Sequence, residues 1–434
     1  MKKTAKDFLS KKPIFLVTDN KLDRTSWKKT FNELGVLPDR IHSFDTFDEA
    51  IRQMEALKPK VLLCTSELKD KNPEGLLSAF RKQNFNRSED LCYLVCDEET
   101  QTIPYLTHEY QLDGFITKPY TANDLNVKIK KVLDEKASYG GFLRAKHKAY
   151  ENLFLEDNEK VEAFFNLCEH KGSLEEADVL FLKGLHKIKT GEVQQGVETL
   201  LEIKAGCLFN YLLRKELFER LTELDRYAEA FEQAKSLIDE FVLPINFLQR
   251  FIKSAILSKN FDSILEYSLK LGPEDLTEEG AGNYLAAGLV LSSPILAKTS
   301  KENAVTANVR AIKFASHKNN IIEQAMQNLC DLQEFELVSN LIEEMAEDQE
   351  LEEALSVPLY RALVPMGESP AKVFQKGVDL TSKGVRDFYV YEIMLELAVK
   401  LGRKKEYLVE LAEDAGKYHP AKESYFRSLI QGRR

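Results

Sequence analysis

Two acids stand where apolar runs of the sequence end. Glu67 closes the run VLLCTSE that begins at Val61, and Asp19 follows the run IFLVT. In a doubly wound α/β sheet, the carboxyl ends of the parallel strands form the crevice in which ligands bind. A carboxylate at such a strand end belongs either to a site or to the remnant of one.

The elements that would position these acids lie between residues 13 and 136. Short apolar runs alternate there with segments of helical periodicity, such as RTSWKKTFNEL with Trp27, Phe31 and Leu34 on one face. This alternation is typical of parallel sheets that helices cover on both faces. We expect an α/β doubly wound, five-stranded parallel sheet. Its predicted strands are PIFLVTDN, RIHSFD, VLLCTSE, LCYLVCD and GFITK.

Composition limits the classes of function. The chain has 434 residues, of which 44% are hydrophobic and 30% charged, as expected for a soluble globular protein of two or three domains. The formal net charge of -10 argues against a nucleic-acid partner, because binding phosphates needs a basic face. The six cysteines are scattered, and the N-terminus lacks a long apolar segment, so we expect a cytoplasmic protein with reduced thiols.

The uncharged stretch from Gly280 to Ala297 tests whether the chain spans a membrane. Its length is close to the minimum for a membrane-spanning helix. It nevertheless contains Asn283 and Pro294, and charged segments lie on both sides of it. We expect a buried helix here and no membrane span.

The chain changes character at Gly140–Gly141, after which the periodicity predicts helices only. Asp157, Gly191, Asp225 and Lys259 are spaced by 34 residues, and each lies at a predicted turn between two amphipathic helices. A helix–turn–helix period of this length is that of the tetratricopeptide repeat. An irregular helical bundle is the alternative.

Small residues support close helix pairs in this half. Gly184 and Gly196 lie on the two helices that flank the turn at Gly191, where small residues let two helices approach closely. After Lys259 the register is disturbed. We expect about eight hairpins in the whole helical half, and a closing helix near residues 425–430. The domains are then an N-terminal tail (1–12), an α/β domain (13–136), a linker (137–141) and a tetratricopeptide-like domain (142–434).

With Asp19 and Glu67 at its predicted strand ends, the α/β domain resembles the receiver domain of bacterial response regulators across residues 13–136, and we call it receiver-like. Asp19 and Asn20 end the first strand, where the family carries a pair of acids. Glu67 stands where the family carries the aspartate that becomes phosphorylated, and Cys96 takes the place of a threonine or serine. The segment DGFITKPY matches best, with Phe115 as the switch aromatic and Lys118 in the Lys-Pro pair.

The resemblance implies a phosphoryl-transfer pocket that has lost some of its parts. The family holds Mg²⁺ with carboxylates and uses the lysine to bind phosphoryl oxygens. Here Asn20 removes one charge, Cys96 replaces a hydroxyl with a weak S–H donor, and Glu67 moves the carboxylate outward by roughly 1.5 Å. We expect a degenerate pocket without catalysis, with no cofactor beyond weak Mg²⁺ binding at Asp19 and Glu67. Glu67 could imitate a phosphorylated aspartate by reaching Lys118, or could be only a solvated acid.

Other catalytic signatures are missing from the sequence. It contains no P-loop, no G-x-S-x-G, no H-E-x-x-H and no paired Cys-x-x-Cys motif. Cys64, Cys92 and Cys96 fall on buried-strand patterns, which predicts packed thiols and no metal site.

These observations favour a non-catalytic signalling adaptor or scaffold in a bacterial pathway of the two-component type. The alternative is a working response regulator whose helical repeats are the output. The helical repeats would bind a protein partner, and the face of the receiver could also mediate self-association. Carrying over tetratricopeptide geometry, the groove that binds the partner would be lined by Phe181, Leu185, Lys215, Glu219, Gln249 and Lys253.

Overall fold

The structure is a computed structural model of the whole chain. It describes residues 9, 12–68, 71–98, 102–204, 206–241, 244–273, 276, 280–315, 318–345 and 354–431. The chain forms two compact units, Met1–Leu243 and Pro244–Arg434, and each is described by itself. Most of the predicted N-terminal tail lies outside the described residues.

The first unit begins with a five-stranded sheet in which all paired strands are parallel. The strand order β2-β1-β3-β4-β5 is one of the common orders of doubly wound sheets. This confirms the predicted five-stranded parallel α/β fold. The strands are β1 (Ile14–Val17), β2 (Ile41–Phe44), β3 (Val61–Thr65), β4 (Leu91–Cys96) and β5 (Gly114–Thr117).

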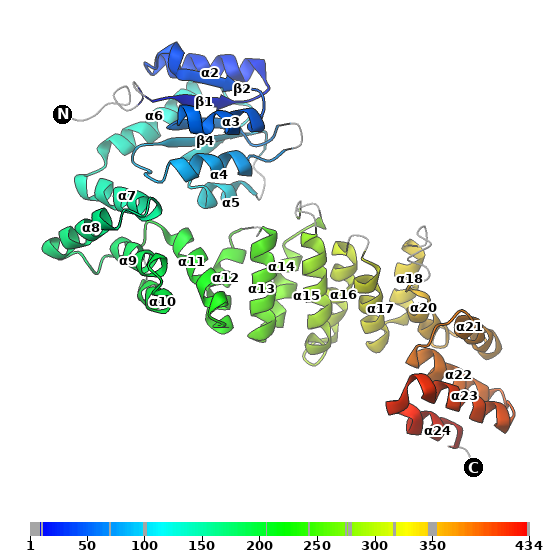
Figure 1. The fold of residues 1–434 in the computed structure, drawn as a ribbon. Coiled ribbons are helices and arrows are strands. Elements are labelled where there is room, and N and C mark those ends of the chain that lie inside the picture. Colours follow the sequence, from blue (N-terminus) through cyan, green and yellow to red (C-terminus); the bar gives the residue numbers. More distant parts are fainter. Residues whose placement is uncertain are drawn as a thin grey trace. The chain divides into compact units, whose positions relative to one another are not determined.

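Helices connect and cover these strands, as Figure 1 shows. Side-chain caps fix where several of them begin: Thr46 accepts the backbone N–H of Glu49, and Thr121 forms a reciprocal capping box with Asp124. Such caps satisfy amide groups that the first turn of a helix leaves unpaired. The helices are α2 (Lys21–Glu33), α3 (Phe47–Leu57), α4 (Glu74–Gln83), α5 (Thr102–Glu109) and α6 (Ala122–Ser138).

One face of the sheet carries a continuous apolar core between the strands and the helices α2 and α6. Trp27 and Phe31 from α2 are fully buried there, together with Leu125 and Ile129 from α6. The strands β1, β3 and β4 are buried along their whole length, as expected when helices cover both faces of a parallel sheet. This core fixes the strand ends at which the candidate site lies.

Within the described ranges, all named strands lie before residue 118, and helices follow. The further helices of the first unit are α7 (Gly141–Phe154), α8 (Asn158–Lys171), α9 (Ala177–Lys189), α10 (Val193–Leu201), α11 (Asn210–Glu223) and α12 (Tyr227–Ile238). Those of the second unit are α13 (Ile245–Leu257), α14 (Phe261–Leu269), α15 (Ala281–Leu296), α16 (Lys301–Phe314), α17 (Asn319–Asp331), α18 (Phe335–Glu344), α20 (Ser356–Leu363), α21 (Pro370–Ser382), α22 (Phe388–Lys400), α23 (Lys405–Tyr418) and α24 (Glu423–Gln431). The last of these contains the predicted closing helix.

The turns between paired helices have left-handed residues at the predicted spacing. Gly191, Asp225 and Lys259 have φ angles of 95°, 57° and 63°. At Gly191, its own N–H bonds to the carbonyl of Ile188, and the next N–H bonds to the carbonyl of Lys187. This is the Schellman pattern of hydrogen bonds, which ends a helix by turning one residue into the left-handed region. The 34-residue step therefore places three turns correctly.

The helices α9 and α10 approach closely because of their glycines. A Cβ atom on Gly184 would lie 2.4 Å from Leu200 Cδ2, and one on Gly196 would lie 2.8 Å from the carbonyl oxygen of Gly184. Any larger residue at either position would push the two helices apart. The prediction from Gly184 and Gly196 is confirmed in this hairpin.

The uncharged stretch forms α15, a largely buried helix that contains Pro294. The next 34-residue step after Lys259 would fall at Ser293, which lies inside this helix and not in a turn between helices, so the register is lost where the sequence predicts. Among the described residues, no helix combines the length and apolar character that crossing a membrane requires.

The boundary between the two compact units lies after Leu243, whereas the predicted linker lies at residues 137–141. The linker is only two residues long between helices, because α6 ends at Ser138 and α7 begins at Gly141. The helices α7 to α12 belong to the same compact unit as the sheet. Contacts of α7 and α11 with the sheet domain explain this grouping.

Candidate functional site

The carboxyl ends of the strands lie at one edge of the sheet, because every strand pair is parallel. Asp19 and Asn20 follow β1 at this edge, and Glu67 follows β3. Cys96 is the last residue of β4, and Lys118 comes directly after β5. The topology thus brings the five predicted pocket residues to the same edge.

Lys118 is held there by two acids that the sequence analysis did not single out. Its Nζ lies 3.3 Å from Asp23 Oδ2 and 2.9 Å from Asp97 Oδ1. Burial alone would lower the pKa of the Lys118 ammonium, but the bonds to Asp97 and Asp23 outweigh it and raise this pKa above its usual value. The Lys118 ammonium is therefore charged and is already paired with two carboxylates of its own domain.

Asp23 is in turn fixed by a short chain of hydrogen bonds. The hydroxyl of Tyr120 donates to Asp23 Oδ1 at 3.2 Å, and Trp27 Nε1–H donates to the Tyr120 oxygen at 2.6 Å. Burial raises the pKa of Tyr120 to about 12, so the phenol keeps the proton that it donates. Because the Trp27 side chain is fully buried, this chain of bonds ties the position of Asp23 to the core.

Asn20 has a structural role in this arrangement. Its Oδ1 accepts the backbone N–H groups of Leu22 and Asp23 at 2.9 and 3.2 Å, so Asn20 caps α2. An amide oxygen has two lone pairs, and both are engaged here. Asn20 is therefore not available as a metal ligand while it caps the helix.

The remaining acids do not complete a magnesium site. Asp19 and Glu67 are exposed, and Glu67 has no ion pair or hydrogen bond with any residue that the structure describes. In the described ranges, no three His, Cys, Asp or Glu side chains are grouped so that they could hold a metal ion. The residues present at this edge do not fit the Mg²⁺ that the family resemblance implies, since that ion needs several convergent oxygens.

Cys96 and Phe115 lie in the neighbouring strands β4 and β5. Cys96 is buried, and its Sγ lies 3.6 Å from the carbonyl oxygen of Ile116. Phe115 is half-buried, and its carbonyl oxygen accepts a hydrogen bond from the Tyr93 hydroxyl at 3.2 Å. The thiol thus faces the neighbouring strand β5, where it is a poor substitute for a hydroxyl that would reach a phosphoryl group.

The opposite edge of the sheet carries a buried cluster of charges that the sequence analysis missed. Lys136 Nζ lies 3.2 Å from Asp90 Oδ1 and 2.8 Å from Asp113 Oδ1, and all three side chains are at most 5% exposed. Arg81 and Arg87 supply the remaining positive charge. Burial alone would raise the pKa of Asp90, but Arg81, Lys136 and Arg87 together hold it below its usual value. A lysine in an amphipathic helix gives no signal in the sequence that it is buried.

Helix α5 of the sheet domain contacts α11 through Glu109. The Tyr211 hydroxyl donates to Glu109 Oε2 at 2.9 Å, and Lys215 pairs with the other carboxylate oxygen. The rings of Phe85 and Phe154 stack with their centroids 4.5 Å apart, which joins the sheet domain to α7 as well. The first helical hairpins are therefore docked on the sheet domain by polar and aromatic contacts.

The predicted groove residues do not form one exposed surface. Phe181 and Leu185 are buried in α9, at 0% and 6% exposure, so they contribute to the core and cannot line an open groove. Lys215 is engaged with Glu109, and Glu219 and Gln249 are half-buried. Lys253 is exposed on α13, in the second unit.

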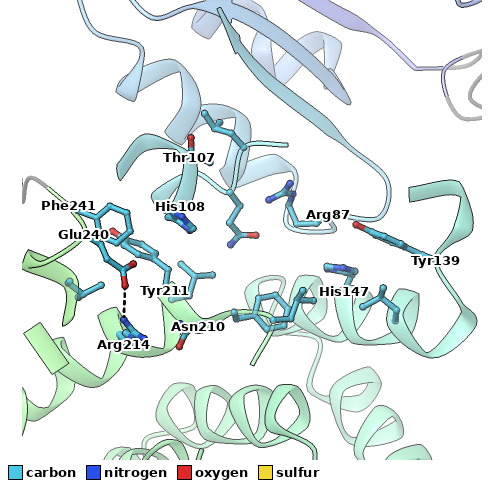
Figure 2. Close-up of a pocket in the computed structure, with 17 residues that line it drawn as sticks. Arg87, Thr107, His108, Tyr139, His147, Asn210, Tyr211, Arg214, Glu240 and Phe241 are labelled. Carbon is cyan, nitrogen blue, oxygen red and sulfur yellow. Dashed lines mark hydrogen bonds and ion pairs between the residues drawn. The ribbon is translucent and has the colours of Figure 1, made fainter. Parts of the chain in front are cut away.

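A cavity of about 340 Å³ lies where these hairpins meet the sheet domain, and all of its lining residues belong to the first unit. Figure 2 shows His108 and Arg87 on its sheet-domain side, His147 on α7, and Arg214 paired with Glu240. No motif in the sequence indicates this cavity, because its lining comes from segments that are far apart in the chain.

Comparisons with known proteins do not assign the chain to a family. No protein-family model matches the sequence, and no curated protein matches it significantly.

Proposed function

We propose that this chain is a non-catalytic adaptor in a signalling pathway of the two-component type. In this proposal the α/β domain is a pseudo-receiver, and the helical hairpins are a tetratricopeptide-like scaffold for a protein partner. The parallel sheet with order 2-1-3-4-5 and the 34-residue spacing of three helical turns support this assignment of the two parts.

The ion pairs of Lys118 with Asp23 and Asp97 are the main observation in support of a non-catalytic domain. In phosphoryl transfer to a carboxylate, a lysine must bind the transferred oxygens, and cations must offset their charge. Lys118 already pairs with Asp23 and Asp97, and Glu67 is not bonded to it. An incoming phosphoryl group would have to break those pairs at a site that lacks the donors for Mg²⁺.

Treatment with acetyl phosphate and Mg²⁺, followed by intact-mass spectrometry, tests this proposal. We expect the wild-type chain to gain no base-labile phosphate. A double variant with Glu67→Asp and Asn20→Asp restores the acids of the receiver family and is the matched comparison. A stoichiometric adduct on wild-type Glu67 would instead support a working response regulator.

A further inference from the structure

The cavity between the sheet domain and the first hairpins has features of a ligand site. It is partly open to solvent and is lined by aromatic and aliphatic side chains, including Phe209, Phe241 and Leu143, together with a few polar groups. A volume of about 340 Å³ is within the range of cavities that bind small molecules. None of the residues at the carboxyl edge of the sheet lines it, so it is separate from the candidate site around Lys118.

Helix α11 begins in the wall of this cavity. Its first three residues, Asn210, Tyr211 and Leu212, all line the cavity, and the N-cap residue Phe209 makes no side-chain cap. Among the described residues, the backbone N–H groups of these three residues have no hydrogen-bond partner, whereas Leu213 N–H bonds to the Phe209 carbonyl. Free amides at a helix N-terminus attract anions, because they add to the positive end of the helix dipole.

His147 provides a second and independent observation. Its side chain lines the cavity from α7, stacked against Tyr139 and edge-on to Phe209, and the residue is only 5% exposed. Its Nδ1 is buried and has no hydrogen-bond partner among the described residues. An unpaired buried polar atom costs free energy, and only a ligand group that reaches Nδ1 would remove this cost.

The charges around the cavity favour a single negative charge on the ligand. Arg87 is already neutralised by Asp113 at 2.5 Å and by Asp90 at 3.4 Å. Arg214 is only loosely paired with the half-exposed Glu240, at 3.5 Å, so it can turn toward an anion near its own helix terminus. Glu240 would repel a doubly charged phosphate more strongly than a carboxylate.

We propose that this cavity binds a small aromatic monocarboxylate, with its carboxylate at the N-terminus of α11. The two carboxylate oxygens accept hydrogen bonds from the first-turn amides and from Arg214, and the ring lies among Phe209, Phe241 and Leu143. A polar substituent on the ring, where the ligand has one, bonds to His147; the probe phenylacetate lacks such a substituent. Because the cavity joins α5, α7 and α11, such a ligand would stabilise the docking of the hairpins on the sheet domain.

Isothermal titration calorimetry of the full chain with phenylacetate tests the proposal, with neutral phenylacetamide and inorganic phosphate as comparisons. We expect phenylacetate to bind in the millimolar range or tighter, and the other two compounds to bind more weakly. Arg214→Gln should weaken phenylacetate binding about 5-fold, because it removes one partly exposed charge-assisted hydrogen bond. Glu240→Gln should strengthen it, because it frees Arg214 and removes the repelling charge.

Three results would overturn the assignment. The first is equal affinity for phenylacetate and phenylacetamide, and the second is tighter binding of phosphate. The third is no detectable phenylacetate binding by either the wild type or Glu240→Gln. Because Glu240 is half-exposed, this variant should fold, so the test does not depend on the stability of Arg214→Gln.

Discussion

Glu109 accepts a hydrogen bond from the Tyr211 hydroxyl at 2.9 Å, although the two residues are 102 positions apart in the chain. This bond joins the last residue of α5 to the first turn of α11, and Lys215 binds the same carboxylate. We expect this contact to make the folding of the sheet domain and of the first hairpins cooperative, because each part positions a bonding partner for the other.

We expect Glu109→Ala to lower the free energy of unfolding of the first unit by about 2 kcal/mol, because it leaves the Tyr211 hydroxyl and the Lys215 ammonium without their partner. Hydrogen exchange should become faster in α11, and chemical denaturation measures the change in stability. Glu55→Ala, at an exposed position on α3, is the matched control and should change stability by less than about 0.5 kcal/mol. Equal effects of the two variants would show that the contact is not important for stability.

The acids around Lys118 should differ in how much they contribute to the free energy of unfolding. Asp23→Asn should lower the free energy of unfolding by about 1–2 kcal/mol, because Asp23 is largely buried and binds both Lys118 and Tyr120. Glu67→Gln should leave stability and the NMR shifts near Phe115 unchanged, because Glu67 is exposed and is not bonded to Lys118. If Glu67→Gln shifted the Phe115 signals while Asp23→Asn did not, Glu67 would be the true partner of the lysine.

His147 should make the first unit sensitive to mild acid. Burial, with help from Arg87 and Lys136, lowers the pKa of His147 to about 4, whereas an unfolded histidine has a pKa of about 6.5. Between these pH values the unfolded chain binds a proton that the folded chain does not bind. Stability contributed by neutral His147 is therefore complete above pH 6.5 and is lost as the pH falls toward 4, by at most about 1.4 kcal/mol per pH unit.

Denaturation of the wild type and of His147→Phe between pH 7 and pH 5 measures this effect. The variant keeps a ring between Tyr139 and Phe209, so its stability should fall less steeply with decreasing pH. Parallel curves for the two proteins would rule out His147 as the group that titrates.

A fragment that begins directly after the predicted linker should aggregate in solution. Residues 142–434 expose the faces of α7 and α11 that the sheet domain covers, including Phe154, which stacks on Phe85. We expect this fragment to bind a hydrophobic dye and to aggregate, whereas residues 244–434 should unfold cooperatively, because they have a core of their own around Tyr360, Tyr391 and Phe426. Light scattering and thermal melts compare the two. A well-behaved 142–434 fragment that binds no dye would show that the docking contacts contribute little.

Periodicity was sufficient to predict the sheet, its five strands and the positions of three helical turns. These features depend on local patterns: apolar runs for β3 and β4, and a residue able to adopt a positive φ angle at Gly191, Asp225 and Lys259. Parallel pairing then brings the strand ends to one edge without any further information, which is why Asp19, Glu67 and Lys118 could be placed together.

The partners of those residues could not be predicted in the same way. Lys118 can reach several acids, and the choice of Asp23 and Asp97 over Glu67 depends on side-chain directions and on the bonds from Tyr120 that hold Asp23. The groove residues Phe181 and Leu185 were assigned by carrying over the geometry of another repeat, but here both are buried. Docking of the hairpins on the sheet domain rests on contacts between distant segments, and no local pattern encodes them.

The buried Lys136 has a consequence for the order of events during synthesis. Asp90 and Asp113 precede β4 and β5, whereas the ammonium group that pairs with both belongs to the last turn of α6. While the ribosome is still extending the chain toward residue 136, these two acids lack that partner, although the strands that follow them are already complete. The nascent α/β domain should therefore remain sensitive to proteases until α6 has left the exit tunnel, and should become resistant in a single late step.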